Sequence, residues 1–255
     1  MAYKDILVFL DPTAEAADRT RLAAGLAKSH GARLIALDLS KPGEDEGIDP
    51  GSATRRMFAD ATREAGISAV FAPAEKTDEG EALSHCVDLM IAPGPESLAH
   101  ASIRGGALDR ALLESGVPML ILPPDWKQGP VGDNIVIAWN AGREAMRAVH
   151  DAMPLLAKAK KVTIFTFSER DSALHATSEM LADHLLRHGV AAQISDWIDT
   201  GEMTALEALF ASLDTQNADL IVAGAFGHSR LFEHLFGGVS LDLMQQPTAP
   251  ILVSH

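Results

Sequence analysis

The chain has 255 residues, of which 47% are hydrophobic and 22% are charged, and its formal net charge is −14 at pH 7. This composition is that of a folded globular protein and excludes a disordered chain. The negative charge repels phosphate backbones and anionic lipids, so we expect no general binding to nucleic acid or to a membrane surface.

The single cysteine, Cys86, excludes an intrachain disulfide and a cysteine-rich metal site, as expected in a reducing compartment. Cys86 precedes an apolar run, and we expect it to lie in the core. The N-terminus enters a short apolar segment without an export signal. The sequence also lacks the uncharged apolar run of roughly 20 residues that crosses a bilayer. These features predict a soluble, cytoplasmic protein.

An internal repeat begins with the first predicted strand. Residues 5–11 (DILVFLD) are echoed by residues 134–140 (NIVIAWN), and both apolar runs end in a carboxylate or an amide. Each run is followed by an alanine-rich stretch with apolar residues at helical spacing, at residues 14–29 and 143–157. The order of strand and helix therefore occurs twice.

The two halves also end alike. Residues 88–92 (DLMIA) match 219–223 (DLIVA), and 117–122 (VPMLIL) match 249–253 (APILV). Ordered matches at an offset of about 130 residues predict a tandem repeat of two related domains. The Pro- and Gly-rich segment 123–130 is typical of a linker, so we predict domains at residues 1–124 and 131–255.

Short β-rich runs alternate with helical stretches in each half. In the second half the predicted strands lie near residues 135–139, 162–167, 191–197, 220–223 and 251–253. Such alternation favours a parallel sheet with helices on both faces. The predicted fold is therefore two tandem five-stranded, Rossmann-like α/β sandwiches. Ligands of such sheets bind beyond the carboxyl ends of the strands.

A glycine-rich motif follows the strand that ends at Ala223. Gly224 and Gly227 are separated by two residues, and nine further residues lead to Gly237, Gly238, Val239 and Ser240. Glycines let the backbone approach an anion, and free N–H groups at a helix start favour phosphate. Taken singly, each glycine is better explained by a tight turn or a helix start than by a ligand.

Together these residues resemble the signature of the universal stress protein family, which is Gly, two residues, Gly, nine residues, Gly, a small hydroxyl residue, one residue and Ser. The resemblance covers essentially the whole chain and is strongest over residues 134–255. It implies an adenine-nucleotide alpha-hydrolase-like fold, an intrachain pseudo-dimer of the two halves, and binding of ATP, ADP or AMP. A homodimer is left open.

The resemblance also implies the site residues. The glycine loop and the following pair would surround the ribose and phosphates through Gly224, Gly227, Gly237, Gly238, Val239 and Ser240. The end of the first strand of the second half, Asn140, would lie near the adenosine. The backbone of Thr166 and Phe167 would meet the adenine. No residue in this set is expected to be catalytic.

Two departures from the family pattern affect this site. Gly238 replaces a serine or threonine, which removes one donor to phosphate but keeps the backbone N–H. Asn140 replaces an aspartate and so lacks the charge that helps to hold Mg²⁺. Assistance by Mg²⁺ is therefore open, and we expect no tightly bound structural metal.

The first half keeps less of the signature. Asp11 and Thr13 follow its first strand, but Pro93 and Pro95 cannot donate N–H groups and Glu96 would repel a phosphate. Only the doublet Gly105-Gly106 remains, and Leu108 stands where the second half has Ser240. We interpret this half as a structural partner with a degenerate site, although a different ligand is not excluded by the sequence.

Other candidate motifs are weaker. His228 and Ser229 suggest a Gly-x-Ser-x-Gly elbow, which fails because Leu231 stands where a small residue is needed. His228 and His234, with Arg230, would place positive charge over a triphosphate or simply face solvent. They form no compact zinc set. The sequence contains neither a P-loop nor a Gly-x-Gly-x-x-Gly fingerprint.

These observations predict a nucleotide-responsive stress protein that acts as a binding protein rather than an enzyme. A slow ATPase is an alternative, but it would need a residue that positions the attacking water, and the sequence offers no convincing general base. A scaffold or chaperone-like protein that binds no nucleotide is the second alternative. The stress, the partners and the higher oligomer are not fixed by fold or family.

Overall fold

The computed structural model of the chain describes residues 2–39, 50–72, 84–94, 111, 114–124, 126–168, 173–225 and 248–255. The chain divides into two units, Met1–Gln128 and Gly129–His255. Among the helices of the described residues, none combines the length and apolar character that a membrane span requires.

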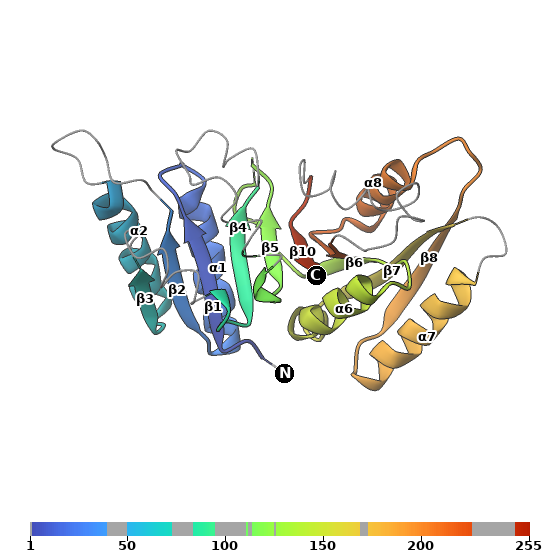
Figure 1. Ribbon diagram of the computed structural model, residues 1–255, viewed down its shortest axis with the longest axis horizontal. Helices are drawn as coiled ribbons and strands as arrows, with labels where there is room; N and C mark the ends of the chain where they lie inside the picture. The colour runs from blue at the N-terminus through green and yellow to red at the C-terminus, as the bar shows by residue number, and fades with distance from the viewer. Residues whose placement is uncertain are drawn as a thin grey trace. The chain divides into compact units, whose positions relative to one another are not determined.

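Unit 1 alternates strands and helices. Its described elements are β1 (Asp5–Leu10), α1 (Ala16–His30), β2 (Arg33–Asp38), α2 (Pro50–Ala65), β3 (Ala69–Ala72), β4 (Leu89–Pro93) and β5 (Met119–Leu122). The strands pair in parallel in the order β3-β2-β1-β4-β5. Helices α1 and α2 pack against each other beside the sheet (Figure 1).

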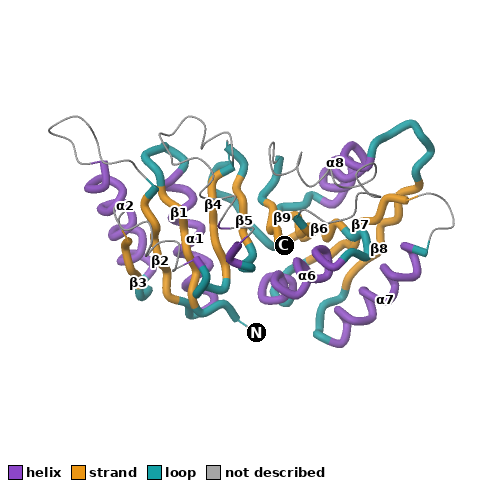
Figure 2. The backbone as a smooth tube through the Cα atoms, viewed as in Figure 1, coloured by secondary structure: helices purple, strands orange, loops and turns teal. Residues whose placement is uncertain are grey.

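Unit 2 repeats this topology. Its described elements are β6 (Asn134–Ala138), α6 (Arg143–Leu156), β7 (Lys161–Ser168), α7 (Leu174–Arg187), β8 (Ala192–Ile198), α8 (Ala205–Gln216), β9 (Leu220–Gly224) and β10 (Ile251–Ser254). The strand order is β10-β9-β6-β7-β8, which is the order of unit 1 with each strand replaced by its repeat. Helices α6 and α7 cover one face of the sheet, and α8 covers the other (Figures 1 and 2).

Apolar side chains of the central strands form the core of each unit. In unit 1, β1, β4 and β5 are buried over nearly their full length, and β9 and β10 are buried likewise in unit 2. Local signals set the helix ends. Gly31 takes the left-handed conformation that ends α1, and Thr204 and Glu207 form a reciprocal capping box at the start of α8.

The structure confirms the predicted fold class of tandem parallel α/β domains. Element ends differ by one or two residues. The first strand of unit 2 ends at Ala138 rather than at Trp139, and α1 begins at Ala16, after a turn in which the Ala16 N–H bonds to the carbonyl of Thr13. The prediction for Cys86 is wrong, because its side chain is exposed. Cys86 lies in a turn before β4, and Val87 takes the buried position.

Candidate functional site

The strand order of unit 2 reverses direction at β6. From β6 the chain moves to β7 and β8 on one side, and it then returns to β9 on the other side of β6. Ligands of open α/β sheets bind where the order reverses in this way. In the register between β6 and β9, Ala138 lies beside Ala223. The predicted site residues Asn140 and Gly224 therefore lie at this reversal.

Asn140 shapes the turn that joins β6 to α6. Its side chain is exposed, and its Oδ1 accepts a hydrogen bond of 2.8 Å from the N–H of Gly142, the N-cap of α6. Between them Ala141 has a φ of 59°, an uncommon value for a residue with a side chain. A Cβ atom on Gly142 would lie 2.8 Å from Asn140 Oδ1. The side chain of Asn140 thus accepts a backbone hydrogen bond at the start of α6.

Gly224 is a glycine because of packing against α6. A Cβ atom there would lie 2.5 Å from the backbone nitrogen of Ala145 and 2.6 Å from the carbonyl carbon of Glu144. Neither backbone atom can move aside as the end of a flexible side chain would. The residue at the end of β9 must therefore lack a side chain whether or not a ligand binds. Its effect is to bring the end of β9 against the first turn of α6.

Thr166 and Phe167 lie where β7 extends beyond β6. The pairing of β7 with β6 ends at Phe165, whereas its pairing with β8 continues to Ser168. Both predicted residues are buried. The backbone of Thr166 and Phe167 therefore extends past the paired part of β6 at the carboxyl edge of the sheet.

A polar network that the sequence analysis missed holds Thr166. Its Oγ1 donates to Oδ1 of Asp196 at 2.5 Å, and Oδ2 of Asp196 contacts Nδ1 of His175. The side chain of His175 is 58% exposed and also lies 3.5 Å from Glu179. Thr166 and Asp196 are partners in the parallel register of β7 and β8. Their side chains therefore lie on the same face of the sheet, and the alternation of side chains along the two strands was the sequence signal for this contact.

The remaining predicted residues, Gly227, Gly237, Gly238, Val239 and Ser240, lie outside the described residues, as do His228, Ser229, Arg230, Leu231 and His234. Within the described part of the chain, no three His, Cys, Asp or Glu side chains are placed to hold a metal ion.

Unit 1 carries a buried ion pair at the corresponding place. Asp11 follows β1 as Asn140 follows β6, but its carboxylate is buried against Arg19 of α1. The N–H of Thr13 donates to Asp11 Oδ1 at 2.9 Å, and Arg19 Nε donates to the carbonyl oxygen of Phe9 at 2.9 Å. Burial lowers the pKa of Arg19, and the charge and hydrogen bond of Asp11 oppose this shift. The acidic group of unit 1 is therefore already neutralised.

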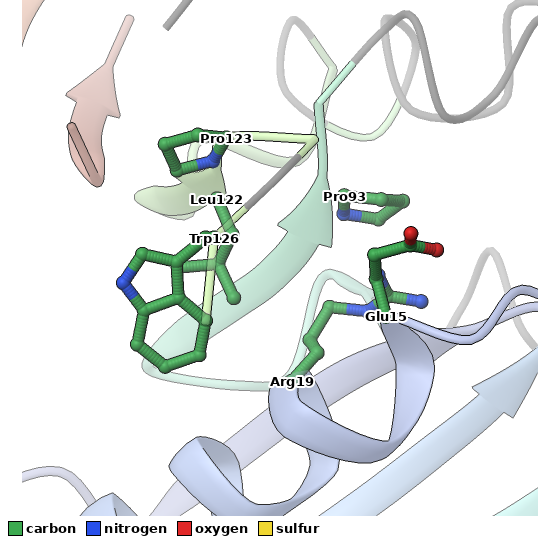
Figure 3. A pocket seen from close by; sticks show the side chains of 6 residues that line it. All are labelled: Glu15, Arg19, Pro93, Leu122, Pro123 and Trp126. Atoms are coloured by element: carbon green, nitrogen blue, oxygen red, sulfur yellow. The ribbon is translucent and has the colours of Figure 1, made fainter. Parts of the chain in front are cut away.

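A small pocket in unit 1 lies beside this ion pair. Figure 3 shows Arg19, Glu15 and Pro93 on one side, and the apolar side chains of Leu122, Pro123 and Trp126 on the other. Arg19 was missed from sequence, although it lies near the start of α1, the helix that follows Asp11. The carboxylate of Glu15 at the rim disfavours an anion here.

Structures of known proteins share this fold. A universal stress protein from Archaeoglobus fulgidus matches with a TM-score of 0.72 at 17% identity, over 98% of this chain and 95% of that chain. A candidate universal stress protein from Pseudomonas aeruginosa matches with a TM-score of 0.63 at 18% identity, over 99% and 93%. A protein of unknown function from Pseudomonas aeruginosa matches with a TM-score of 0.61 at 17% identity, over 99% and 92%.

No family model and no curated protein matches the sequence. At these identities the structural matches establish the fold. The chain has the fold of universal stress proteins over nearly its whole length.

Proposed function

We propose that this chain is a universal stress protein that binds an adenine nucleotide, ATP in the first instance, at the carboxyl edge of the unit 2 sheet. The observation that carries the proposal is the meeting of Asn140 and Gly224 at the strand reversal, beside the first turn of α6. The glycine signature continues from Gly224 in the sequence. The proposal combines this position with the fold.

The residues of this edge fit a nucleoside. Asn140 retains an amide N–H₂ that can donate to a ribose hydroxyl while its Oδ1 holds Gly142. The end of β7 offers backbone groups at Thr166 and Phe167 for the edge of a base. The phosphates would be held by the backbone N–H groups of the signature from Gly227 to Ser240.

At this site we expect Mg²⁺ to bind less strongly than the nucleotide does. Asn140 supplies no negative charge, and its carbonyl oxygen already accepts a bond from Gly142. Any ion would therefore depend mainly on phosphate oxygens of the nucleotide and on water, as Mg²⁺ commonly does.

The test is a calorimetric titration of ATP into the purified chain, with and without Mg²⁺, together with mass spectrometry of any small molecule that co-purifies. We expect close to one equivalent per chain, because the acidic group of unit 1 is already paired with Arg19. Two equivalents would contradict the degenerate reading of unit 1. Absence of both heat and retained nucleotide would refute nucleotide binding and favour the scaffold.

Two asparagines on β6 and its following turn provide a matched pair of variants. Asn134 lies at the amino end of β6, and its Nδ2 donates to the carbonyl of Asn217 at 3.0 Å. Asn140→Ala should weaken ATP binding about tenfold, the equivalent of one lost hydrogen bond of about 1.4 kcal/mol. Asn134→Ala loses one hydrogen bond at the opposite edge and should leave the affinity unchanged. Equal effects of both variants would contradict the proposed location.

One observation bears on the alternative of a slow ATPase. His175 and Asp196 form a pair of the kind that carries a proton, and they lie beside Thr166 at the same edge of the sheet. Hydrolysis that exceeds a Ser240→Ala control and is lost in His175→Ala would identify an enzyme. Hydrolysis that is the same in all three proteins would assign the activity to a contaminant.

A further inference from the structure

Three histidines gather on the helical face of unit 2, away from the polar network at Thr166. His150 lies on α6, His184 lies on the last turn of α7, and His188 is the residue that caps α7. The ring centres of His150 and His184 are 5.8 Å apart, and those of His184 and His188 are 4.8 Å apart. His184 is thus the central ring of the three.

The geometry points to a surface site for a divalent transition-metal ion of the zinc class, held by His184 and His188 with His150 as third ligand. This inference is independent of nucleotide binding. Nothing in the site at the strand ends requires it.

The ring separations match those of histidines that share a metal. Zinc binds imidazole nitrogen at about 2.0–2.1 Å in a tetrahedral arrangement, which places two ligating rings about 5 Å apart, centre to centre. The two observed separations lie on either side of this value. A spacing of four residues on a helix is also the spacing by which two histidines chelate one zinc ion.

The backbone that carries these rings is anchored. His150 lies on α6 next to Val149 and near Ala152, and both of these residues are fully buried. At the end of α7 the N–H of Val190 donates to the carbonyl of Leu185 at 3.0 Å, and both residues are buried. Two rigid segments therefore present the three imidazoles.

The side chains retain freedom at the surface. His150 and His188 are exposed, and His184 is half-buried. In their present rotamers the donors of the described residues do not converge on one point. Rotation of the exposed rings about χ1 and χ2, which occurs in picoseconds to nanoseconds for exposed side chains, is the adjustment that binding needs.

The electrostatic surroundings act in both directions. Burial, followed by the charges of His188, His150 and Arg187, lowers the pKa of His184. The neutral form of an imidazole is the one that binds metal. Arg187 opposes a bound cation, whereas the net charge of −14 attracts one.

The experiment titrates Co²⁺ into the full chain without nucleotide and follows visible absorption, with Zn²⁺ as competitor. We expect one saturable equivalent of Co²⁺ that Zn²⁺ displaces. His184→Ala should abolish it, and His150→Ala and His188→Ala should each weaken it at least about tenfold, the scale of losing even an outer-shell partner.

His175→Ala is the matched control, because this exposed histidine lies on the same helix but contacts Asp196 and Glu179 instead. It should leave Co²⁺ binding unchanged, and circular dichroism checks that each variant folds. The inference is overturned if no saturable binding occurs, if the three cluster variants bind as the unaltered chain does, or if His175→Ala is the variant that loses the ion.

Discussion

The carboxyl ends of β1 and β6 occupy the same place in two copies of one fold, yet they have opposite characters. In unit 1 the strand leads to Asp11, which is buried in an ion pair with Arg19. In unit 2 it leads to Asn140, whose exposed side chain accepts a hydrogen bond from the N–H of Gly142. Among the described residues, an internal ion pair fills this place in unit 1, whereas an exposed amide side chain occupies it in unit 2.

The helix that follows each strand explains the difference. Arg19 lies eight residues after Asp11, and the residue eight positions after Asn140 is Ala148. Both are buried, but a methyl group cannot reach the strand end as a guanidinium does. Among the described residues of unit 2, no cation takes the position that Arg19 has in unit 1.

The strands that pair with β1 and β6 also differ between the two units. In unit 1, β1 pairs with β2 through to Asp38, the last residue of β2. In unit 2, pairing with β6 stops three residues before the end of β7. In unit 2, the last three residues of β7 therefore pair with β8 and not with β6. A repeat can keep its topology while one copy places an internal ion pair where the other has an exposed amide.

The largest effect should come from removing the buried cation. Arg19→Met leaves the Asp11 carboxylate buried without its partner, and we expect a loss of about 3–5 kcal/mol in the free energy of unfolding. Urea unfolding followed by circular dichroism measures it. The matched control is Arg33→Met in the same unit, where the ion pair with Asp5 is largely exposed and is worth about 0–1 kcal/mol. Equal losses would show that the buried pair does not hold unit 1 together.

A second comparison uses two glycines. Gly224→Ala places a methyl group against the backbone of α6, and overpacking of this kind costs about 1–3 kcal/mol. Gly25 lies on an exposed position of α1 with open space around it, so Gly25→Ala should stabilise by about 0.5–1 kcal/mol through helix propensity. Thermal unfolding of the two variants should shift in opposite directions. A tolerated Gly224→Ala would remove the packing reason for this glycine.

The sequence was sufficient for the architecture because apolar runs, helical spacing and the repeat all depend on local patterns. It placed Asn140 and Gly224 at neighbouring strand ends for the same reason. It missed Arg19, because an arginine on an amphipathic helix is ordinarily solvated and only tertiary contact reveals its carboxylate partner. It also misplaced Cys86, because adjacency to a buried strand does not fix the side on which a turn residue points.

The glycine signature illustrates a further limit of the sequence. Spacing alone could not separate packing from ligand binding at Gly224, and the atoms of α6 supply the packing explanation. Gly227 to Ser240 remain predictions.

A smaller effect on stability is expected at Asn140, in the turn between β6 and α6. Asn140→Ala removes the acceptor of the Gly142 N–H and should lower the free energy of unfolding by about 1 kcal/mol. Asn140→Asp retains an acceptor and should stay within about 0.5 kcal/mol of the unaltered chain. Urea midpoints compare the two. If Asn140→Asp were the more damaging change, the turn would require the amide nitrogen as well as the oxygen.

The smallest effect concerns a feature that the two units share at the opposite edge of their sheets. Asp88 accepts bonds from the backbone N–H groups of Lys4 and Asp5, and Asp219 accepts from those of Gly132 and Asn134. Within the described part of the chain, Oδ2 of Asp219 is buried without a hydrogen bond of normal geometry. Burial raises the pKa of this carboxyl group, and the backbone N–H groups of Asn134, Gly132 and Asp133 oppose that shift.

A raised pKa in the folded state favours folding below the carboxyl group's unfolded pKa, and this contribution is lost as the pH rises through the folded pKa. The ionised carboxylate of Asp219 therefore costs stability at pH 7. Asp219→Asn should raise the free energy of unfolding there only slightly, by less than about 0.5 kcal/mol because solvent screens this half-buried group, and the gain should vanish near pH 3. Urea unfolding at both pH values measures the difference. A gain of equal size at both would assign the effect to hydrogen bonding of the new amide, because only the charge of the carboxylate depends on pH.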